Sequence, residues 1–146
     1  MRLINCLLIG LLVTGSATFS SCNKETRIEK NLWEKGGKWT IESLEAKKVS
    51  TFLPDNFDVT AFNYGTFTFT KDGTGIYVFT YNGNYDSGIF HYSSTKDKLL
   101  MSFYNDDYEF GMNWKKNEVQ ITRTENFSSS LGSGTYSESY SLKKEK

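Results

Sequence analysis

The chain has 146 residues, and its 17 basic and 17 acidic side chains give a formal net charge of zero at pH 7. This balance supplies no electrostatic basis for binding nucleic acid or an anionic membrane surface, so we expect no nucleic-acid partner. Aromatic residues make up 16% of the chain and there is one proline. This composition favours β-structure over helix in a single domain.

An apolar run opens the chain. After Arg2, residues 3–13 are almost entirely apolar, and mostly small residues continue as far as Ser21. The apolar run is shorter than the roughly 20 residues that a membrane-spanning helix needs. This pattern predicts a secretory signal peptide over residues 1–21.

Residues 19–22, Phe-Ser-Ser-Cys, resemble the lipobox of bacterial lipoproteins. The resemblance implies that the leader is cut before Cys22 and that Cys22 carries several acyl chains, such as palmitate, as stable anchoring requires. The partner would then be a lipid bilayer, and the protein would be anchored to the outer membrane of the bacterial cell envelope, facing the periplasm or the surface. Cys6 lies in the leader, so the processed chain would have no disulfide and no free thiol. The alternative is a plain secreted protein with one stray cysteine.

Residues 22–36 are expected to be the lipidated cysteine and a polar tether. Polar and charged residues dominate this segment. Ile28, Leu32 and Trp33 could instead place one apolar helical face against the end of the folded domain. Both interpretations remain open from the sequence.

From Gly37 onward, short alternating runs are separated by turn residues, which predicts β-strands. The eight predicted strands cover residues 38–45, 64–70, 75–81, 87–92, 98–104, 108–114, 119–122 and 135–142. In the first strand, Trp39, Ile41 and Ser43 are expected to share one face. Residues 46–63 are expected to be a long connection and residues 124–134 a Ser/Gly-rich loop.

Asp72-Gly73 and Asn82-Gly83 predict tight hairpins, because these residues tolerate the positive φ angles of two-residue turns. Eight short strands with mostly tight connections predict an all-β fold, an antiparallel up-and-down barrel over residues 37–146. Closing the sheet removes exposed strand edges. The outward face is rich in Thr, Ser and Asn rather than apolar, which excludes a barrel that spans a membrane. We expect a monomer.

Gly37-Lys38-Trp39 resembles the G-x-W signature of lipocalins. Together with the lipobox and the run Phe-Thr-Phe-Thr-Lys-Asp-Gly-Thr-Gly at 67–75, the layout is similar to lipocalin-like lipoproteins of Bacteroidetes. The resemblance implies an eight-stranded lipocalin-like barrel. It also implies that Trp39 packs across the closed end of the barrel against Arg123, a structural role for both residues.

No residue pattern indicates catalysis. His91 is the single histidine and no nucleophile motif accompanies it, so we expect a surface histidine and no enzyme. One histidine and no free cysteine cannot build a transition-metal site, and no cofactor is expected. Asp106-Asp107 with Glu109 could bind calcium weakly, but such a turn is more typical of a solvated hairpin.

An aromatic stripe is the candidate binding feature. Its residues are Phe67, Phe69, Tyr77, Phe79, Phe103, Tyr108, Phe110, Trp114, Tyr136 and Tyr140. The stripe could line a cavity for a small apolar or amphipathic ligand, held near the 46–63 connection. It could equally be a filled core, which the bulk of so many rings favours. A filled barrel would fit the alternative function, a structural lipoprotein that binds an envelope protein or a glycan through its surface.

Overall fold

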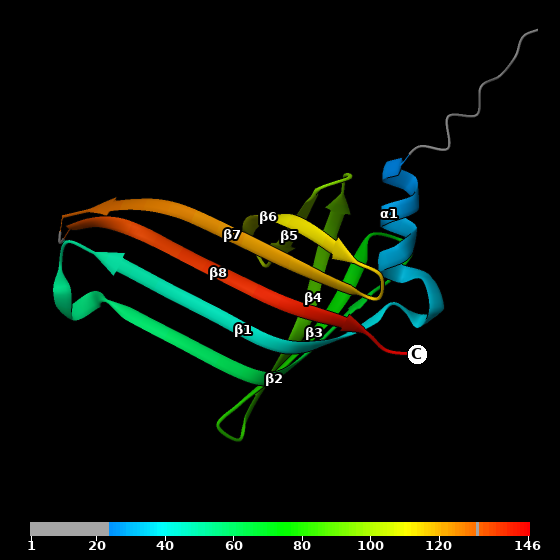
Figure 1. Ribbon diagram of the computed structural model, residues 1–146, viewed down its shortest axis with the longest axis horizontal. Coiled ribbons are helices and arrows are strands. Elements are labelled where there is room, and N and C mark those ends of the chain that lie inside the picture. The colour runs from blue at the N-terminus through cyan, green and yellow to red at the C-terminus, as the bar shows by residue number, and fades with distance from the viewer. Residues whose placement is uncertain (1–23, 131) are drawn as a thin grey trace, which may run out of the picture.

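The computed structural model describes residues 24–130 and 132–146, and the leader and Cys22 lie outside this range. Eight antiparallel strands pair in chain order, and β8 pairs with β1 to close a barrel (Figure 1). The predicted fold class, an eight-stranded up-and-down barrel of lipocalin-like form, is confirmed. The strands are β1 (Lys38–Ser50), β2 (Phe57–Phe69), β3 (Thr74–Tyr81), β4 (Asn84–Ser94), β5 (Lys98–Phe103), β6 (Asp106–Lys115), β7 (Glu118–Ser129) and β8 (Gly132–Lys144). The helices are α1 (Lys24–Trp33) and the 3₁₀ turns η1 (Glu34–Gly36) and η2 (Leu53–Asp55).

Four strands form an extension that the sequence does not predict. β1, β2, β7 and β8 run well past the ends of the other four and form an extension at one end of the barrel (Figure 1). The predicted connection over 46–63 and the predicted loop over 124–134 are therefore wrong, since most of both segments is strand. Residues 46–50 and 124–129 lack a clear apolar alternation, so the sequence does not mark them as strands. Long-range pairing, such as Lys48 with both Phe57 and Tyr136, decides their conformation instead.

A β-bulge at Glu42 changes which face of β1 points inward. The register of β1 with both neighbours shifts between Ile41 and Ser43. Beyond the bulge, Leu44 pairs with Tyr140, and Ser43 pairs with Phe62, whose side chain is 73% exposed. The prediction that Ser43 shares a face with Trp39 and Ile41 is therefore wrong, because one extra residue reverses the alternation.

Both predicted hairpin turns are confirmed. Gly73 has φ +81°, and Asn82 and Gly83 have φ +50° and +77°. At the first turn, Asp72 accepts hydrogen bonds from the Thr74 amide at 3.0 Å and the Thr74 hydroxyl at 2.7 Å. The second turn is the expected two-residue loop between the paired residues Tyr81 and Asn84, whereas the first has three residues, 71–73, because the Thr70 amide donates to the Thr74 carbonyl. Tight turns of both kinds fix the register of the strands that they join.

The closed end of the barrel is filled and is covered by α1. Leu32, Trp39 and Phe69 are each no more than 1% exposed, and the Trp39 indole donates to the Leu32 carbonyl at 2.9 Å. Ile28 and Trp33 pack against the same core. Of the two interpretations of residues 22–36, the helical one holds over residues 24–33. Within residues 24–130 and 132–146, no helix combines the length and the apolar character that crossing a membrane requires.

Candidate functional site: a cavity at the open end of the barrel

The open end of the barrel holds a cavity of about 820 Å³. Its lining comes from β1, η2, β2, β3 and from β5 to β8: Lys48, Asp55, Phe57, Phe67, Phe79, Phe103, Tyr104, Asp106, Tyr108, Phe110, Arg123, Glu125, Phe127, Ser129, Tyr136, Glu138 and Tyr140. The expectation of a barrel filled throughout is wrong for this half. The filled-barrel form of the alternative function is wrong for the same reason.

The cavity exists because the ring of eight paired strands is complete only near the closed end of the barrel. β2 pairs with β3 over residues 65–69, and β6 pairs with β7 over residues 111–115 of β6. Beyond these levels, β2 and β7 continue within the extension, and among the described residues no strand pairs with their outer edges. The rest of the lining comes from β3, β5 and β6, and the side chains of these strands and of the extension leave the space between them open.

Seven residues of the predicted aromatic stripe line the cavity: Phe67, Phe79, Phe103, Tyr108, Phe110, Tyr136 and Tyr140. The other three belong to the packed interior. The Phe69 ring lies 4.9 Å from that of Tyr92, Trp114 packs edge-on against Trp39 at 5.9 Å, and Tyr77 lies 4.8 Å from Phe79. The stripe is thus divided between core and cavity.

A buried polar cluster forms one wall of the cavity. The Arg123 and Glu138 side chains are each 11% exposed, with Arg123 Nε 3.3 Å from a Glu138 oxygen. The other Glu138 oxygen accepts hydrogen bonds from the Tyr136 hydroxyl at 2.9 Å and the Tyr140 hydroxyl at 3.3 Å. Arg123 also contacts the Glu125 carboxylate at 2.9 Å. Charged groups at this depth are stable only when paired in this way.

The tyrosine hydroxyls of this cluster stay protonated. Burial, together with the nearby Glu138 carboxylate, raises the pKa of Tyr136 to about 12. The same two causes, burial first, raise the pKa of Tyr140 further. Both hydroxyls are therefore hydrogen-bond donors to Glu138 at neutral pH.

Arg123 does not contact Trp39, so the pairing implied by the lipocalin resemblance is wrong. The Arg123 guanidinium lies 4.4 Å from the centre of the Tyr108 ring and 5.4 Å from that of Tyr136. The cation over the Trp39 ring is Lys144, with its ammonium 5.2 Å from the ring centre. Arg123 Nε is close to Glu138 but not aligned for a hydrogen bond, and no other described residue accepts one from it.

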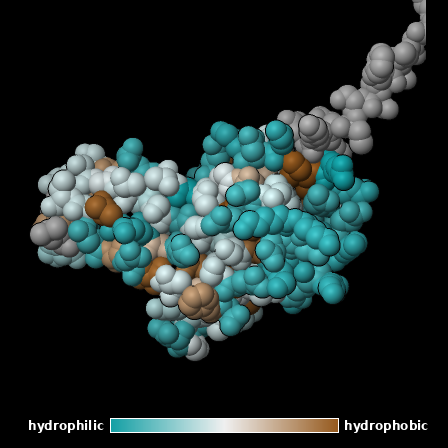
Figure 2. Space-filling model, in the orientation of Figure 1, coloured by the Kyte–Doolittle hydropathy of each residue, from teal (hydrophilic) through white to brown (hydrophobic). Residues whose placement is uncertain are grey.

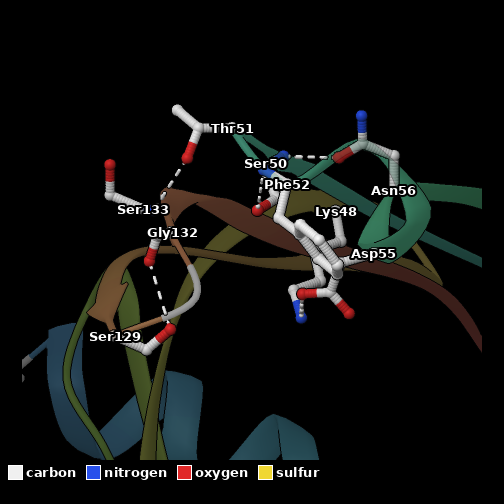
Figure 3. A network of polar contacts seen from close by, with 9 residues as sticks. All are labelled: Lys48, Ser50, Thr51, Phe52, Asp55, Asn56, Ser129, Gly132 and Ser133. Atoms are coloured by element: carbon white, nitrogen blue, oxygen red, sulfur yellow. Dashed lines mark hydrogen bonds and ion pairs between the residues drawn. The ribbon is translucent and has the colours of Figure 1, made fainter.

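The lip of the cavity is held by a polar network at the tip of the extension (Figure 3). The Thr51 amide donates to the Ser133 carbonyl at 2.9 Å, and the Ser133 amide donates to the Thr51 hydroxyl at 3.1 Å. The Asn56 side chain accepts from the Ser50 amide at 2.6 Å. The two Thr51–Ser133 bonds join the β1–β2 tip to the β7–β8 tip, and the Asn56–Ser50 bond closes the β1–β2 connection, so the lip is preorganised.

Lys48 and Phe57 lie between the tip network and the cavity, and both residues line the cavity. The Lys48 ammonium pairs with Asp55 (Figure 3) and lies 4.9 Å from the centre of the Phe127 ring. The Phe57 ring meets that of Tyr136 edge-on at 6.2 Å. The rim thus presents both aromatic faces and charge.

Neither Arg123 nor Glu138 was predicted to line a cavity, although the sequence carries a signal for both. Arg123 stands two residues after Ile121 on β7, and Glu138 stands between Tyr136 and Tyr140 at intervals of two on β8. Both positions continue an inward face. A charged residue at an inward position of a barrel strand is itself an indication of a polar site.

The remaining sequence predictions concern the single histidine, the possible metal ligands and the lipidated cysteine. His91 is exposed on the outer face of β4, as expected. Asp106 lines the cavity, whereas Asp107 accepts a hydrogen bond from the Ser102 hydroxyl at 2.5 Å. Within the described residues, no three His, Cys, Asp or Glu side chains are grouped so that they could hold a metal ion. The lipidation expected at Cys22 lies outside those residues.

The outer surface offers no comparable feature on the face shown in Figure 2. Hydrophilic residues cover most of this face, and apolar residues form small separate spots. Single exposed apolar side chains are normal on a folded protein.

Comparison with known proteins assigns no family. No family model, no curated protein and no solved structure matches this chain.

Proposed function

We propose that this protein is a non-catalytic binding protein that holds one small amphipathic ligand in the cavity at the open end of its barrel. The cavity itself carries the proposal. Its volume of about 820 Å³ lies within the roughly 300–1,000 Å³ typical of small-molecule sites. Such sites combine mainly apolar walls with a few positioned polar groups, and this cavity has both.

The arrangement of the lining suits an amphipathic molecule. Phe67, Phe79 and Phe110 offer an apolar surface where the cavity meets the packed core. A ligand hydrocarbon placed there gains about 0.8 kcal/mol for each methylene that it buries. The Arg123–Glu138 cluster and the tyrosine hydroxyls stand on the neighbouring wall, where they can orient a polar group.

The proposal includes an envelope location through acylated Cys22. α1 lies at the closed end of the barrel, opposite the extension (Figure 1). One residue, Asn23, separates Cys22 from the start of α1, so the two positions are at most about 7 Å apart. An anchor at Cys22 would place the closed end beside the bilayer and direct the cavity mouth away from it.

Titration of the folded domain with N-phenyl-1-naphthylamine, a neutral fluorescent probe, tests ligand binding. We expect saturable enhancement of fluorescence at one site. Phe79→Ser, inside the cavity, should weaken probe binding by about tenfold, the scale of removing one large apolar contact. Ile89→Ser is the matched control because Ile89 is 70% exposed on the outer face.

Thermal unfolding of each variant shows whether it is folded, and only the affinities of folded variants are compared. If the wild-type protein shows no saturable binding, or if both variants weaken it equally while remaining folded, the proposed function is wrong. Native mass spectrometry of freshly purified protein gives a second measurement, since a bound ligand adds a discrete mass.

A further inference from the structure

We infer that the cavity selects an amphiphile with a positively charged head, such as an alkylamine, over a fatty acid of the same length. The inference rests on the proposed function and names the class of ligand. Six charged side chains line the cavity. Two are cations, Lys48 and Arg123, and four are carboxylates, Asp55, Asp106, Glu125 and Glu138. The lining therefore carries a formal charge of −2.

Both cations are already neutralised by the protein. Lys48 pairs with Asp55, and Arg123 lies 2.9 Å from a Glu125 oxygen and 3.3 Å from a Glu138 oxygen. The face of the Arg123 guanidinium is covered by the Tyr108 ring at 4.4 Å. A fatty-acid carboxylate that approached Arg123 would meet two carboxylates beside it. Like charges so placed oppose binding.

The carboxylates, by contrast, are in excess. Glu125 and Glu138 share the single positive charge of Arg123. Among the described residues, no lysine or arginine lies within ion-pair distance of Asp106, which pairs across the strands with Phe103 at the cavity rim. One negative charge therefore remains at the Glu125–Glu138 pair and one at Asp106, and either can neutralise a cationic head.

Aromatic rings beside Asp106 add a second attraction for a cation. Tyr104 and Tyr108 both line the cavity, two residues to either side of Asp106. Ring faces attract ammonium groups, and the contribution of Tyr104 is at the weak end of the range because this residue is 89% exposed. The Tyr108 ring already has Arg123 over it. The protein's own cations use this interaction in the same cavity, since Lys48 lies over Phe127. The hydrocarbon tail would lie against the apolar residues Phe67, Phe79 and Phe110.

Displacement of N-phenyl-1-naphthylamine by three decyl ligands tests the inference. Decylamine, decanol and decanoic acid share one chain and differ in the charge of the head at pH 7. We expect decylamine to bind at least about tenfold more tightly than decanoic acid, with decanol between them. The difference should shrink as salt is raised from low to high concentration, because screening weakens interactions between partly exposed charges.

Asp106→Asn provides the decisive variant and Asp107→Asn its matched control. The two residues are neighbours, but Asp106 lines the cavity and Asp107 bonds to Ser102 beside it. Asp106→Asn should reduce decylamine affinity several-fold and leave decanol affinity unchanged. Asp107→Asn should change neither affinity.

The outcomes separate the inference from the proposed function. If decanol binds but decanoic acid binds as tightly as decylamine, the inference is wrong and the binding function stands. Equal losses of decylamine affinity in the two Asn variants would also overturn the inference. If none of the three ligands displaces the probe and the probe itself does not bind, the proposed function fails as well.

Discussion

The two ends of this barrel are built from the same alternating strands, yet one is packed and the other is hollow. At the closed end all eight strands face one another, and Trp39, Ile41 and Phe69 are at most 1% exposed. At the open end, the inward side chains of the extension and those of β3, β5 and β6 border a cavity of about 820 Å³. The comparison teaches that inward-facing aromatic residues make a core only where opposite strands supply a second layer of side chains.

The two ends are also stabilised by different interactions. The closed end has α1 as a cover, held by burial of Leu32 and by the hydrogen bond from the Trp39 indole. At the open end the described residues place only the 3₁₀ turn η2 beside the cavity, and no α-helix. Backbone pairing, the tip network and the Arg123–Glu138 cluster hold it instead. Apolar burial thus dominates one end and polar contacts dominate the other.

The largest difference is expected when one aromatic residue is removed from each end. Trp39→Ala should lower the free energy of unfolding by about 3–5 kcal/mol, because it leaves a void in a closed core and an unpaired Leu32 carbonyl. Phe57→Ala at the cavity rim should cost about 1 kcal/mol, since the Phe57 side chain is already 41% exposed. Urea denaturation measures the change in unfolding free energy for both variants. Equal losses would contradict the division into packed and hollow ends.

A smaller effect is expected for the polar wall of the cavity. Arg123→Met leaves Glu125 and Glu138 without their cation, and should cost about 1.5–3 kcal/mol, the range for hydrogen bonds and ion pairs to charged groups away from water. Lys47→Met is the control, because the Lys47–Asp58 pair at 3.0 Å lies on the exposed surface. The control should change stability by less than about 0.5 kcal/mol. If both variants behave alike, the cluster does not stabilise the open end.

The smallest effect concerns acid stability at the turn between β2 and β3, beside the packed end. Hydrogen bonds from the Thr70 and Thr74 side chains, then from the Thr74 amide, lower the pKa of Asp72 to about 2. A lowered pKa means that Asp72 stabilises the folded state above its ordinary pKa near 3.8, and that this contribution disappears as the pH falls through about 2. Asp72→Asn should therefore remove part of the pH dependence of unfolding between about pH 4 and pH 2. An NMR titration that gave the Asp72 carboxyl an ordinary pKa would contradict this prediction.

The local features of the fold were predictable from the sequence. Asp72-Gly73 and Asn82-Gly83 identified two hairpins, and the alternation of Tyr108, Phe110, Met112 and Trp114 identified a strand face. These signals are local, because turn geometry and side-chain direction depend on a few neighbouring residues. Seven of the ten predicted stripe residues were found at the cavity for the same reason.

The extension and the polar wall were not predictable in this way. Residues 46–50 and 124–129 lack a clear apolar alternation, so their strand conformation depends on partners far along the chain. The bulge at Glu42 left no local signal and reversed the expected face of β1. Arg123 could be assigned to Trp39 only by resemblance, whereas its partners Glu125 and Glu138 become evident once β7 and β8 are in register.

The sequence by itself determined that this chain forms an eight-stranded antiparallel barrel with aromatic side chains pointing inward. The tertiary structure decided where those side chains make a core and where they line a cavity. The physical reason is that alternation specifies the direction of a side chain, but packing depends on what stands opposite it. Opposite Phe69 stand Phe90 and Tyr92, and the space there is filled. Beside the extension, the side chains of β3, β5 and β6 complete the lining without filling it, and the space there can take a ligand.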